Sequence, residues 1–125
     1  MGKKIIVSTK LPVAGPYSIG VAAGGFIFIS GQLPVDPNTG EIAGDIRVAT
    51  RQVLENIKSV ITAAGLTMAD IVKTTVFLTN MNDFPAVNEI YSEYFPEAPP
   101  ARSTVAVNSL PKGAPLEVEA IALQR

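Results

Sequence analysis

The chain has 125 residues, the size of one domain, with 10 basic and 11 acidic residues and a formal net charge of -1. A balance this close to neutral argues against binding to nucleic acid or to an anionic membrane, both of which need an excess of positive charge. The chain has no Cys and no His, which excludes disulfides, thiolate nucleophiles and the commonest general base and metal ligand, and leaves carboxylates, Arg, Lys, hydroxyls, backbone groups and water for any catalysis.

Three strands are predicted in the first quarter of the chain. Lys4 to Ser8 and Gly25 to Ser30 are short runs rich in Ile, Val and Phe and bounded by Pro or Gly, a pattern typical of strands. Tyr17 to Ala23 is a weaker strand prediction between them. Val35 to Gly40 contains turn residues, because Pro37 presets φ and the glycine at its end can adopt a left-handed conformation.

An amphipathic helix is predicted from Asp45 to Gly65. Its apolar residues recur at intervals of three and four, which places them on one stripe. The residues of this stripe are Ile46, Ala49, Val53, Ile57, Val60, Ile61 and Ala64. Gly65 ends the helix as a C-cap would. Arg51 and Glu55 lie on the opposite side, as an i,i+4 pair worth only about 0.2–0.5 kcal/mol.

The second half of the chain contains a strand, a helix and two more strands. Ile71 to Thr79 is predicted to be a strand because it is β-branched almost throughout. A second helix follows, with Asp83 as its N-cap and Pro85 in its first turn, where a missing N–H does no harm. Prolines between residues 96 and 100 end this helix. The predicted strands Arg102 to Asn108 and Leu116 to Leu123 close the chain.

The order of these elements predicts a single α+β domain over residues 1–125, with both helices on one face of a sheet. The other face of the sheet would then need a cover. Hydrophobic residues make up 47% of the chain and charged residues 17%, against roughly 25% charged in an ordinary soluble domain. We therefore expect an oligomer, in which three such sheets pack face to face around a shared axis.

A cytoplasmic location is expected. No apolar run approaches the ~20 residues that a membrane-spanning helix needs, so no membrane partner is expected. The first residues, Met-Gly-Lys-Lys, lead into a predicted strand without the apolar stretch of a signal peptide.

The final predicted strand carries two carboxylates on one face. Alternation places Glu117 and Glu119 on the same side as Ile121 and Leu123. On this pattern alone, a strand whose first half reaches solvent is the commoner explanation. The alternative is that one Glu lines a cleft, where partial desolvation would raise its pKa toward a value useful in catalysis.

Arg102 begins the preceding strand, directly after the restricted backbone of residues 99–101. If the last two strands pair as neighbours, Arg102 and Glu117 approach each other from opposite ends of the connection. A structural ion pair is then at least as good an interpretation as a functional one. In the functional interpretation, the planar guanidinium binds a substrate carboxylate, and Lys would not be an equivalent replacement.

Four segments resemble, in order and spacing, the motifs of the reactive intermediate deaminase family, also called RidA or YjgF. They are GPYSIGV (residues 15–21), FISGQLPVDPNTGEI (28–42), IVKTTVFLTNMNDFPAVNEIYSEYF (71–95) and PPARSTVAVNSLPKGAPLEVEAIAL (99–123). A single short motif would carry little weight, whereas these four cover nearly the whole chain from about Gly15 onward.

The resemblance implies a chorismate-mutase-like α+β fold with a mixed β-sheet. It also implies a homotrimer built on a central β-barrel, with three active sites in clefts between subunits. The implied activity is hydrolysis of the enamine 2-aminoacrylate and of the imines 2-iminopropanoate and 2-iminobutanoate to 2-keto acids and ammonia. No cofactor and no metal are expected for this reaction.

The same resemblance implies roles for two charged residues and one aromatic residue. Arg102 would bind the substrate carboxylate through a bidentate contact, and Glu117 would position the attacking water and transfer protons. Tyr17 would close the cleft, although from the sequence alone a core aromatic whose hydroxyl reaches solvent is the commoner case.

Four further residues complete the implied substrate-binding set. Ser30 and Gly31 would contact the reacting end of the substrate, and Asn88 would orient substrate or water. Without the resemblance, Gly31 is equally well a turn at a strand end, Ser30 a hydroxyl that satisfies a loop, and Asn88 a polar residue at the edge of a helix. Thr104 stands where many family members have Cys, so any role that depends on a thiol is excluded, whereas a contact through the backbone carbonyl would survive the change.

Two other functions remain open. A non-enzymatic trimer could use the same clefts to bind a small carboxylate or to engage a protein partner, since a fold alone does not fix a function. Nucleic-acid cleavage or inhibition of translation is disfavoured by the near-neutral charge and the missing His.

Overall fold

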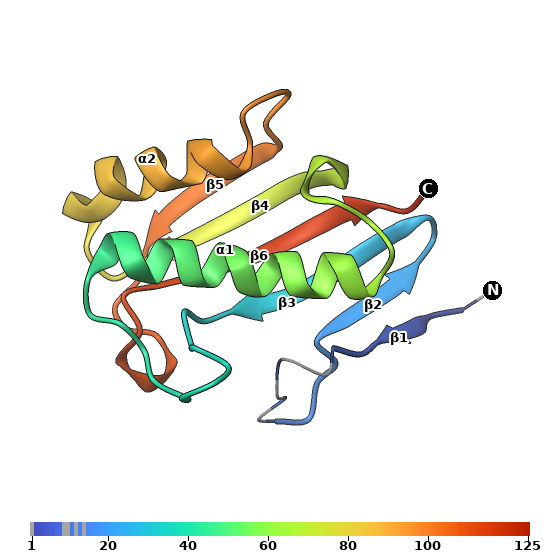
Figure 1. Cartoon of the computed structure of the whole chain (residues 1–125), viewed down its shortest axis with the longest axis horizontal. Helices are drawn as coiled ribbons and strands as arrows, with labels where there is room; N and C mark the ends of the chain where they lie inside the picture. Colours follow the sequence, from blue (N-terminus) through green and yellow to red (C-terminus); the bar gives the residue numbers. More distant parts are fainter. Residues whose placement is uncertain (1, 9–10, 12, 14) are drawn as a thin grey trace.

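The computed structural model of the chain describes residues 2–8, 11, 13 and 15–125. Its helices and strands are, in chain order, β1 (Lys4–Ile6), β2 (Gly20–Ala23), β3 (Phe26–Gln32), α1 (Ile46–Ala63), β4 (Ile71–Leu78), α2 (Phe84–Tyr94), β5 (Ala101–Ala106) and β6 (Leu116–Leu123), as shown in Figure 1. Short 3₁₀ turns, η1 (Met68–Asp70), η2 (Met81–Asp83) and η3 (Pro111–Gly113), precede β4, α2 and β6. Each predicted strand and helix is present, and the largest difference is that only the second half of Tyr17 to Ala23 is strand.

The six strands form one mixed sheet in the order β1-β2-β3-β6-β4-β5. β4 and β5 run parallel, and the other neighbouring pairs are antiparallel. The parallel pair follows from the connection through α2, because parallel neighbours need a long crossover. β6 pairs with β3 on one side and with β4 on the other, so the last strand of the chain lies inside the sheet.

The conditional expectation that the last two strands pair as neighbours is wrong. β4 separates β5 from β6, because the crossover through α2 returns β5 to the free side of β4 at the edge of the sheet. The last strand then pairs antiparallel with the other side of β4. Arg102 and Glu117 therefore lie on strands that are not adjacent.

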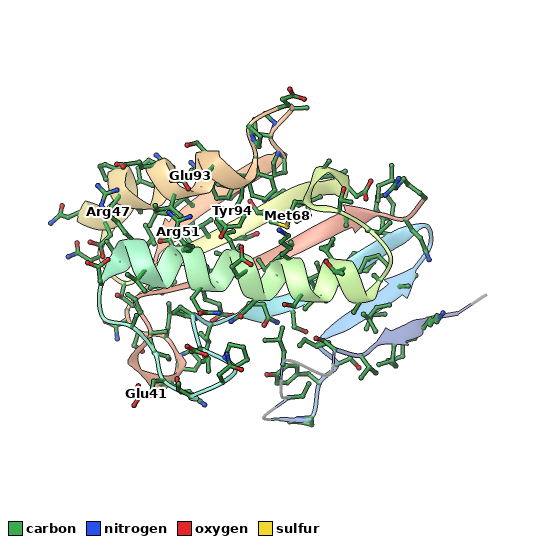
Figure 2. The ribbon with its side chains drawn as sticks, in the orientation of Figure 1. Glu41, Arg47, Arg51, Met68, Glu93 and Tyr94 are labelled. Atoms are coloured by element: carbon green, nitrogen blue, oxygen red, sulfur yellow. The ribbon has the colours of Figure 1, made fainter. Side chains whose placement is uncertain are left out.

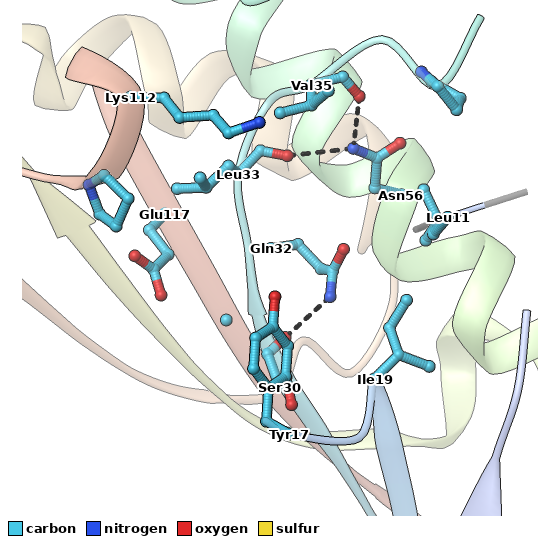
Figure 3. Close-up of a pocket in the computed structure, with 13 residues that line it drawn as sticks. Leu11, Tyr17, Ile19, Ser30, Gln32, Leu33, Val35, Asn56, Lys112 and Glu117 are labelled. Carbon is cyan, nitrogen blue, oxygen red and sulfur yellow. Dashed lines mark hydrogen bonds between the residues drawn. The ribbon is translucent and has the colours of Figure 1, made fainter. Parts of the chain in front are cut away.

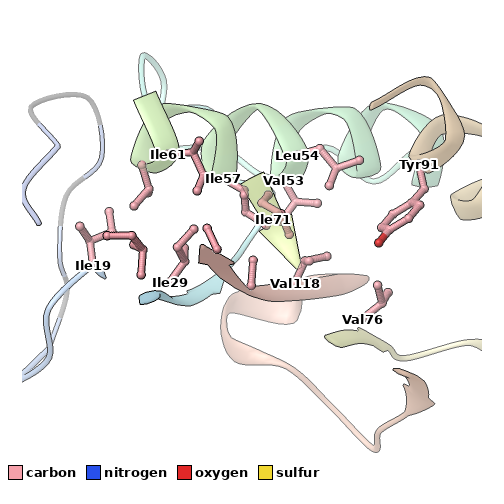
Figure 4. Packing of buried hydrophobic residues seen from close by; sticks show 14 of the residues in the cluster. Ile19, Ile29, Val53, Leu54, Ile57, Ile61, Ile71, Val76, Tyr91 and Val118 are labelled. Atoms are coloured by element: carbon pink, nitrogen blue, oxygen red, sulfur yellow. The ribbon is translucent and has the colours of Figure 1, made fainter. Parts of the chain in front are cut away.

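Both helices cover the same face of the sheet (Figure 1). The buried face of α1 packs on alternate residues of β3, β6 and β4, and Figure 4 shows Val53, Leu54 and Ile57 above Ile29 and Val118. The predicted stripe is confirmed, since its five members from Ala49 to Ile61 are fully buried. None of the helices in the described part of the chain has both the length and the hydropathy of a membrane-spanning segment.

Both ends of α1 are capped, and the cap at Gly65 is the one that the sequence predicts. The Asp45 side chain accepts hydrogen bonds from the backbone N–H groups of Arg47 and Val48, at 2.9 and 3.1 Å. At the other end, Gly65 adopts φ 78°, and the N–H of Leu66 donates to the carbonyl of Ile61 at 3.0 Å. This C-cap geometry satisfies carbonyl groups that the last turn leaves unpaired.

The charged side chains of α1 bind side chains of α2 instead of one another. Arg51 forms an ion pair with Glu93 at 2.9 Å, and Glu55 accepts a hydrogen bond from the Tyr94 hydroxyl at 2.6 Å, so the predicted pair between Arg51 and Glu55 is wrong. Figure 2 shows Arg51, Glu93 and Tyr94 between the two helices. The neighbouring helix offers partners that an isolated helix lacks. Asp83 occupies the N-cap position of α2, but its side chain makes no capping hydrogen bond.

Candidate functional site

A cavity of about 530 Å³ lies where β3 leaves the sheet. Its wall is formed by the end of β3, the segment that follows it, the middle of α1, the turn η3 and the start of β6 (Figure 3). The lining residues are Leu11, Tyr17, Ile19, Ser30, Gly31, Gln32, Leu33, Val35, Pro37, Asn56, Pro111, Lys112 and Glu117. Four of the predicted site residues, Tyr17, Ser30, Gly31 and Glu117, thus line one cavity.

A β-bulge brings two of these residues to the cavity. Ile29 pairs with Ala120 and Gln32 with Val118, so two residues of β3, Ser30 and Gly31, lie opposite a single residue of β6. Bulges of this kind are common next to active sites, because they re-aim side chains and interrupt pairing.

The Glu117 carboxylate leaves no room for a side chain at position 31, where the chain has glycine. The interpretation of Gly31 as a turn is wrong, since it lies within β3 and its φ is not positive. A Cβ added at position 31 would overlap the Oε2 atom of Glu117. The missing side chain is therefore the space that the carboxylate occupies.

Ser30 supports the wall of the cavity. Its hydroxyl donates to the carbonyl of Ser18 at 2.5 Å, and its own carbonyl accepts a hydrogen bond from the Gln32 side chain at 3.1 Å. The hydroxyl thus satisfies a loop, as one of the two interpretations predicted. Its oxygen lone pairs remain able to accept a hydrogen bond from a ligand.

The pKa of Glu117 is raised above the ordinary value of a glutamate. Partial burial is the main cause, because it disfavours the charged form, and the like charge of Glu119 adds to it. Both carboxylates lie on the sheet face that is turned away from the helices, as alternation along β6 predicted. Of the two, Glu117 lines the cavity and Glu119 is exposed.

We expect Glu117→Gln to stabilise the protein at neutral pH. A raised pKa means that the folded state binds a proton more tightly than the unfolded chain, so stability falls as pH rises from the ordinary pKa through the folded one. Above that window the ionised carboxylate costs stability, and Gln removes the cost. Thermal unfolding should show a higher Tm for Glu117→Gln than for the wild type at about pH 7.5, and the two Tm values should converge near pH 4. Equal Tm values at both pH values would contradict this expectation.

The other predicted site residues form a second group, between β5 and α2. The Arg102 guanidinium lies over the Tyr91 ring, 4.7 Å from its centroid, and 5.4 Å from the centroid of Phe84. Asn88 lies between these two aromatic residues on α2, and Thr104 follows Arg102 at the next position on the same face of β5. Asn88 Oδ1 and Thr104 Oγ1 are buried and have no hydrogen-bond partner among the described residues.

The two groups do not meet within one copy of the chain. Arg102 pairs with Thr74, whose side chain is buried beneath the helices, whereas Glu117 pairs with Phe77 on the opposite face. Arg102 is also absent from the lining of the cavity. The predicted convergence of the guanidinium and the carboxylate therefore requires a second copy.

The structure also adds residues that the sequence did not single out. Lys112, Gln32 and Asn56 line the cavity. Asn56 is buried, and its side-chain amide donates to the carbonyls of Leu33 and Val35 at 3.0 and 2.9 Å, which fixes the segment after β3. The polar Asn56 inside an apolar helical stripe was the sequence signal for this role. No group of three or more carboxylates in the described ranges is arranged to hold a metal ion.

Comparisons with known proteins cover nearly the whole chain. The family model described as Endoribonuclease L-PSP matches residues 7–124. The chain is 53% identical over 122 residues to a RutC family protein of Pyrococcus horikoshii, covering 96% of this chain and 97% of that protein. It is 49% identical over 126 residues to the 2-iminobutanoate/2-iminopropanoate deaminase of Salmonella typhimurium, covering 98% of this chain and 98% of that protein. The crystal structure of the YjgF gene product of Escherichia coli matches with a TM-score of 0.93 at 48% identity, covering 98% of this chain and 99% of that chain.

Proposed function

Because the chain belongs to the RidA/YjgF family of reactive intermediate deaminases, we propose that it hydrolyses small enamines and imines of 2-amino acids. The proposed substrates are 2-aminoacrylate, 2-iminopropanoate and 2-iminobutanoate, and the products are 2-keto acids and ammonia. The observation that carries the proposal is the Glu117 carboxylate, which has a raised pKa and lies against Gly31 in a cavity large enough for a small acid.

The proposed enzyme is a homotrimer, because the two groups of site residues must come from different copies. The sheet face opposite the helices supports this assembly, since large apolar side chains remain exposed on it. They are Ile5, Phe26, Phe28, Val105 and Leu123. Packing of three such faces around one axis would bury them. Arg102, Asn88 and Thr104 of one subunit would then complete the cavity of the next.

In the proposed reaction, Arg102 holds the substrate carboxylate while Glu117 directs water to the imine carbon. The water oxygen forms the C–O bond as Glu117 takes one proton, which the carboxyl group passes to the imine nitrogen. A second proton, from the new hydroxyl, then moves to nitrogen as the C–N bond breaks and the keto group forms. Positioned acid–base catalysis of this kind contributes roughly 10²–10⁴-fold, and no metal or covalent nucleophile is required.

Glu119→Gln tests the acid–base role of Glu117. The reaction needs ionised Glu117 to take a proton from water, so kcat/KM should fall as pH drops through the raised pKa of this group. Glu119→Gln removes a like charge that helps to raise this pKa, so the acidic limb of the profile should move to lower pH. The check is the pH profile of kcat/KM for both proteins with one substrate. A limb that stays in place or moves to higher pH would argue against Glu117 as the titrating group.

A coupled assay tests the proposed activity. An amino-acid oxidase generates 2-iminobutanoate from 2-aminobutanoate, and the imine that remains is trapped with semicarbazide. Addition of the protein should lower the trapped imine and raise 2-oxobutanoate by the same amount. Unchanged imine at micromolar protein, with the compound still bound, would favour a non-enzymatic binding protein.

The description of the matching family model names a second activity, endoribonucleolytic cleavage. The net charge of -1 and the absence of His argue against it in this chain, because RNA binding needs a positive surface and metal-free cleavage of RNA needs a general base near neutral pH. Incubation with RNA at physiological salt provides the test.

A further inference from the structure

Lys112 occupies a strained position in the wall of the cavity. It adopts φ 59° and ψ 19°, the left-handed backbone conformation that residues other than glycine rarely adopt. The turn η3 imposes this conformation through hydrogen bonds from Gly113 N to Leu110 O at 3.2 Å and from Ala114 N to Pro111 O at 3.1 Å. Strain of this kind concentrates at functional sites, where the surrounding structure holds it.

The ammonium group of Lys112 has no partner within the described residues. Ser30, Gln32 and Asn56, which line the same cavity, direct their side-chain donors to backbone carbonyls. Neither this ammonium group nor the Glu117 carboxylate makes an ion pair or a hydrogen bond with any residue in the described ranges. Figure 3 shows the Lys112 side chain running past Leu33 toward Val35, at the end of the cavity opposite Tyr17.

Within one copy of the chain, the cavity is larger than the substrates of the proposed reaction require. Its volume of about 530 Å³ lies within the roughly 300–1,000 Å³ of pockets that hold drug-sized ligands, whereas 2-iminobutanoate has only seven non-hydrogen atoms. Apart from Lys112, the only charged group among the described lining residues is Glu117, which repels anions. Lys112 adds a cation that forms no ion pair with a carboxylate of the described residues.

We propose that Lys112 binds a second carboxylate, and that the substrates therefore include imines of acidic amino acids such as aspartate and glutamate. This inference rests on the proposed function and extends it. Arg102 holds the 2-carboxylate by its planar fork, while the flexible lysine receives the side-chain carboxylate as a point charge. The reaction is the same hydrolysis: the oxygen of water replaces the imine nitrogen, which leaves as ammonia, and the other product is a dicarboxylic keto acid.

The test compares two substrates in the imine-loss assay. Iminosuccinate is generated from aspartate by an aspartate oxidase, and 2-iminobutanoate serves as the substrate with one carboxylate. Lys112→Met keeps the length of the side chain and its backbone preference but removes the charge. We expect it to lower kcat/KM for iminosuccinate about five- to tenfold, mainly through KM, as one partly exposed charge contact would. The rate with 2-iminobutanoate should change less than about twofold.

Three controls separate the effect of the charge from that of its position. Lys112→Arg should retain most of the iminosuccinate activity. Raised salt should lower the wild-type kcat/KM for iminosuccinate more than that for 2-iminobutanoate. Lys58→Met, on the exposed side of α1, should leave both substrates unchanged. Thermal unfolding checks that each variant is folded.

The outcomes also separate this inference from the proposed function. Equal losses on both substrates, or no loss on iminosuccinate, would overturn the role of Lys112. A wild type that hydrolyses 2-iminobutanoate but not iminosuccinate would refute the acidic-substrate inference alone. A wild type that hydrolyses neither imine would refute the proposed function and this inference with it.

Discussion

Replacement of Arg102 by Ala is expected to remove imine turnover while the protein stays folded. Two charge-assisted hydrogen bonds to the substrate carboxylate would be lost, each worth about 1.5–3 kcal/mol, which corresponds to a fall in kcat/KM of roughly 10²–10⁴-fold. The structural cost is smaller, because the stack of the guanidinium on Tyr91 and Phe84 contributes only about 0.5–2 kcal/mol. Steady-state kinetics with 2-iminobutanoate and thermal unfolding measure the two effects.

Arg102→Lys is the matched control for charge. Lys keeps the positive charge but loses the planar fork, so we expect kcat/KM to remain at least about tenfold below the wild type. Wild-type rates for both variants would remove Arg102 from the mechanism. A loss of the folded state in both would assign Arg102 to the packing of β5 against α2.

Gly31→Ala should be nearly as damaging, for a steric reason. The added methyl group would overlap the Glu117 carboxylate and displace it from the imine carbon. A shift of about 1 Å in a catalytic group can cost about 10²-fold in rate, so we expect a loss of that order in kcat. Kinetics with 2-iminobutanoate provide the measurement.

Gly44→Ala is the matched control, because a Cβ at position 44 has no atom within 4 Å and Gly44 does not have a positive φ. It should leave activity and stability unchanged. A double-mutant cycle adds a second check, since Gly31→Ala should cost little stability once Glu117 is replaced by Ala. Full activity of Gly31→Ala would show that Glu117 does not act from the position seen here.

The elements of the fold were predictable because their signals are local. The stripe from Ala49 to Ile61, the caps at Asp45 and Gly65, and the alternation along Leu116–Leu123 each follow from a few neighbouring residues. Strand order was not predictable in this way. The position of β6 between β3 and β4 depends on pairings far apart in the sequence, which no local pattern encodes.

The site was predictable only in part. Motif resemblance indicated Tyr17, Ser30, Gly31 and Glu117, which line one cavity. The residues alone did not show why position 31 is glycine, since the reason is a carboxylate 86 positions further along the chain. The sequence also gave no sign that Arg102 and Glu117 lie on opposite faces of the sheet, because the face of Arg102 depends on the register of β5 against β4.

The place of β6 has a consequence for how the protein is made. The ribosome completes this strand last, yet β3 and β4 are joined only through it. Until β6 emerges, β3 and β4 each present an open edge and the core is unfinished, which are features that promote aggregation. The sheet can therefore close only after β6 has been made, and a chain that stops before Leu116 would have no central strand with which to close it.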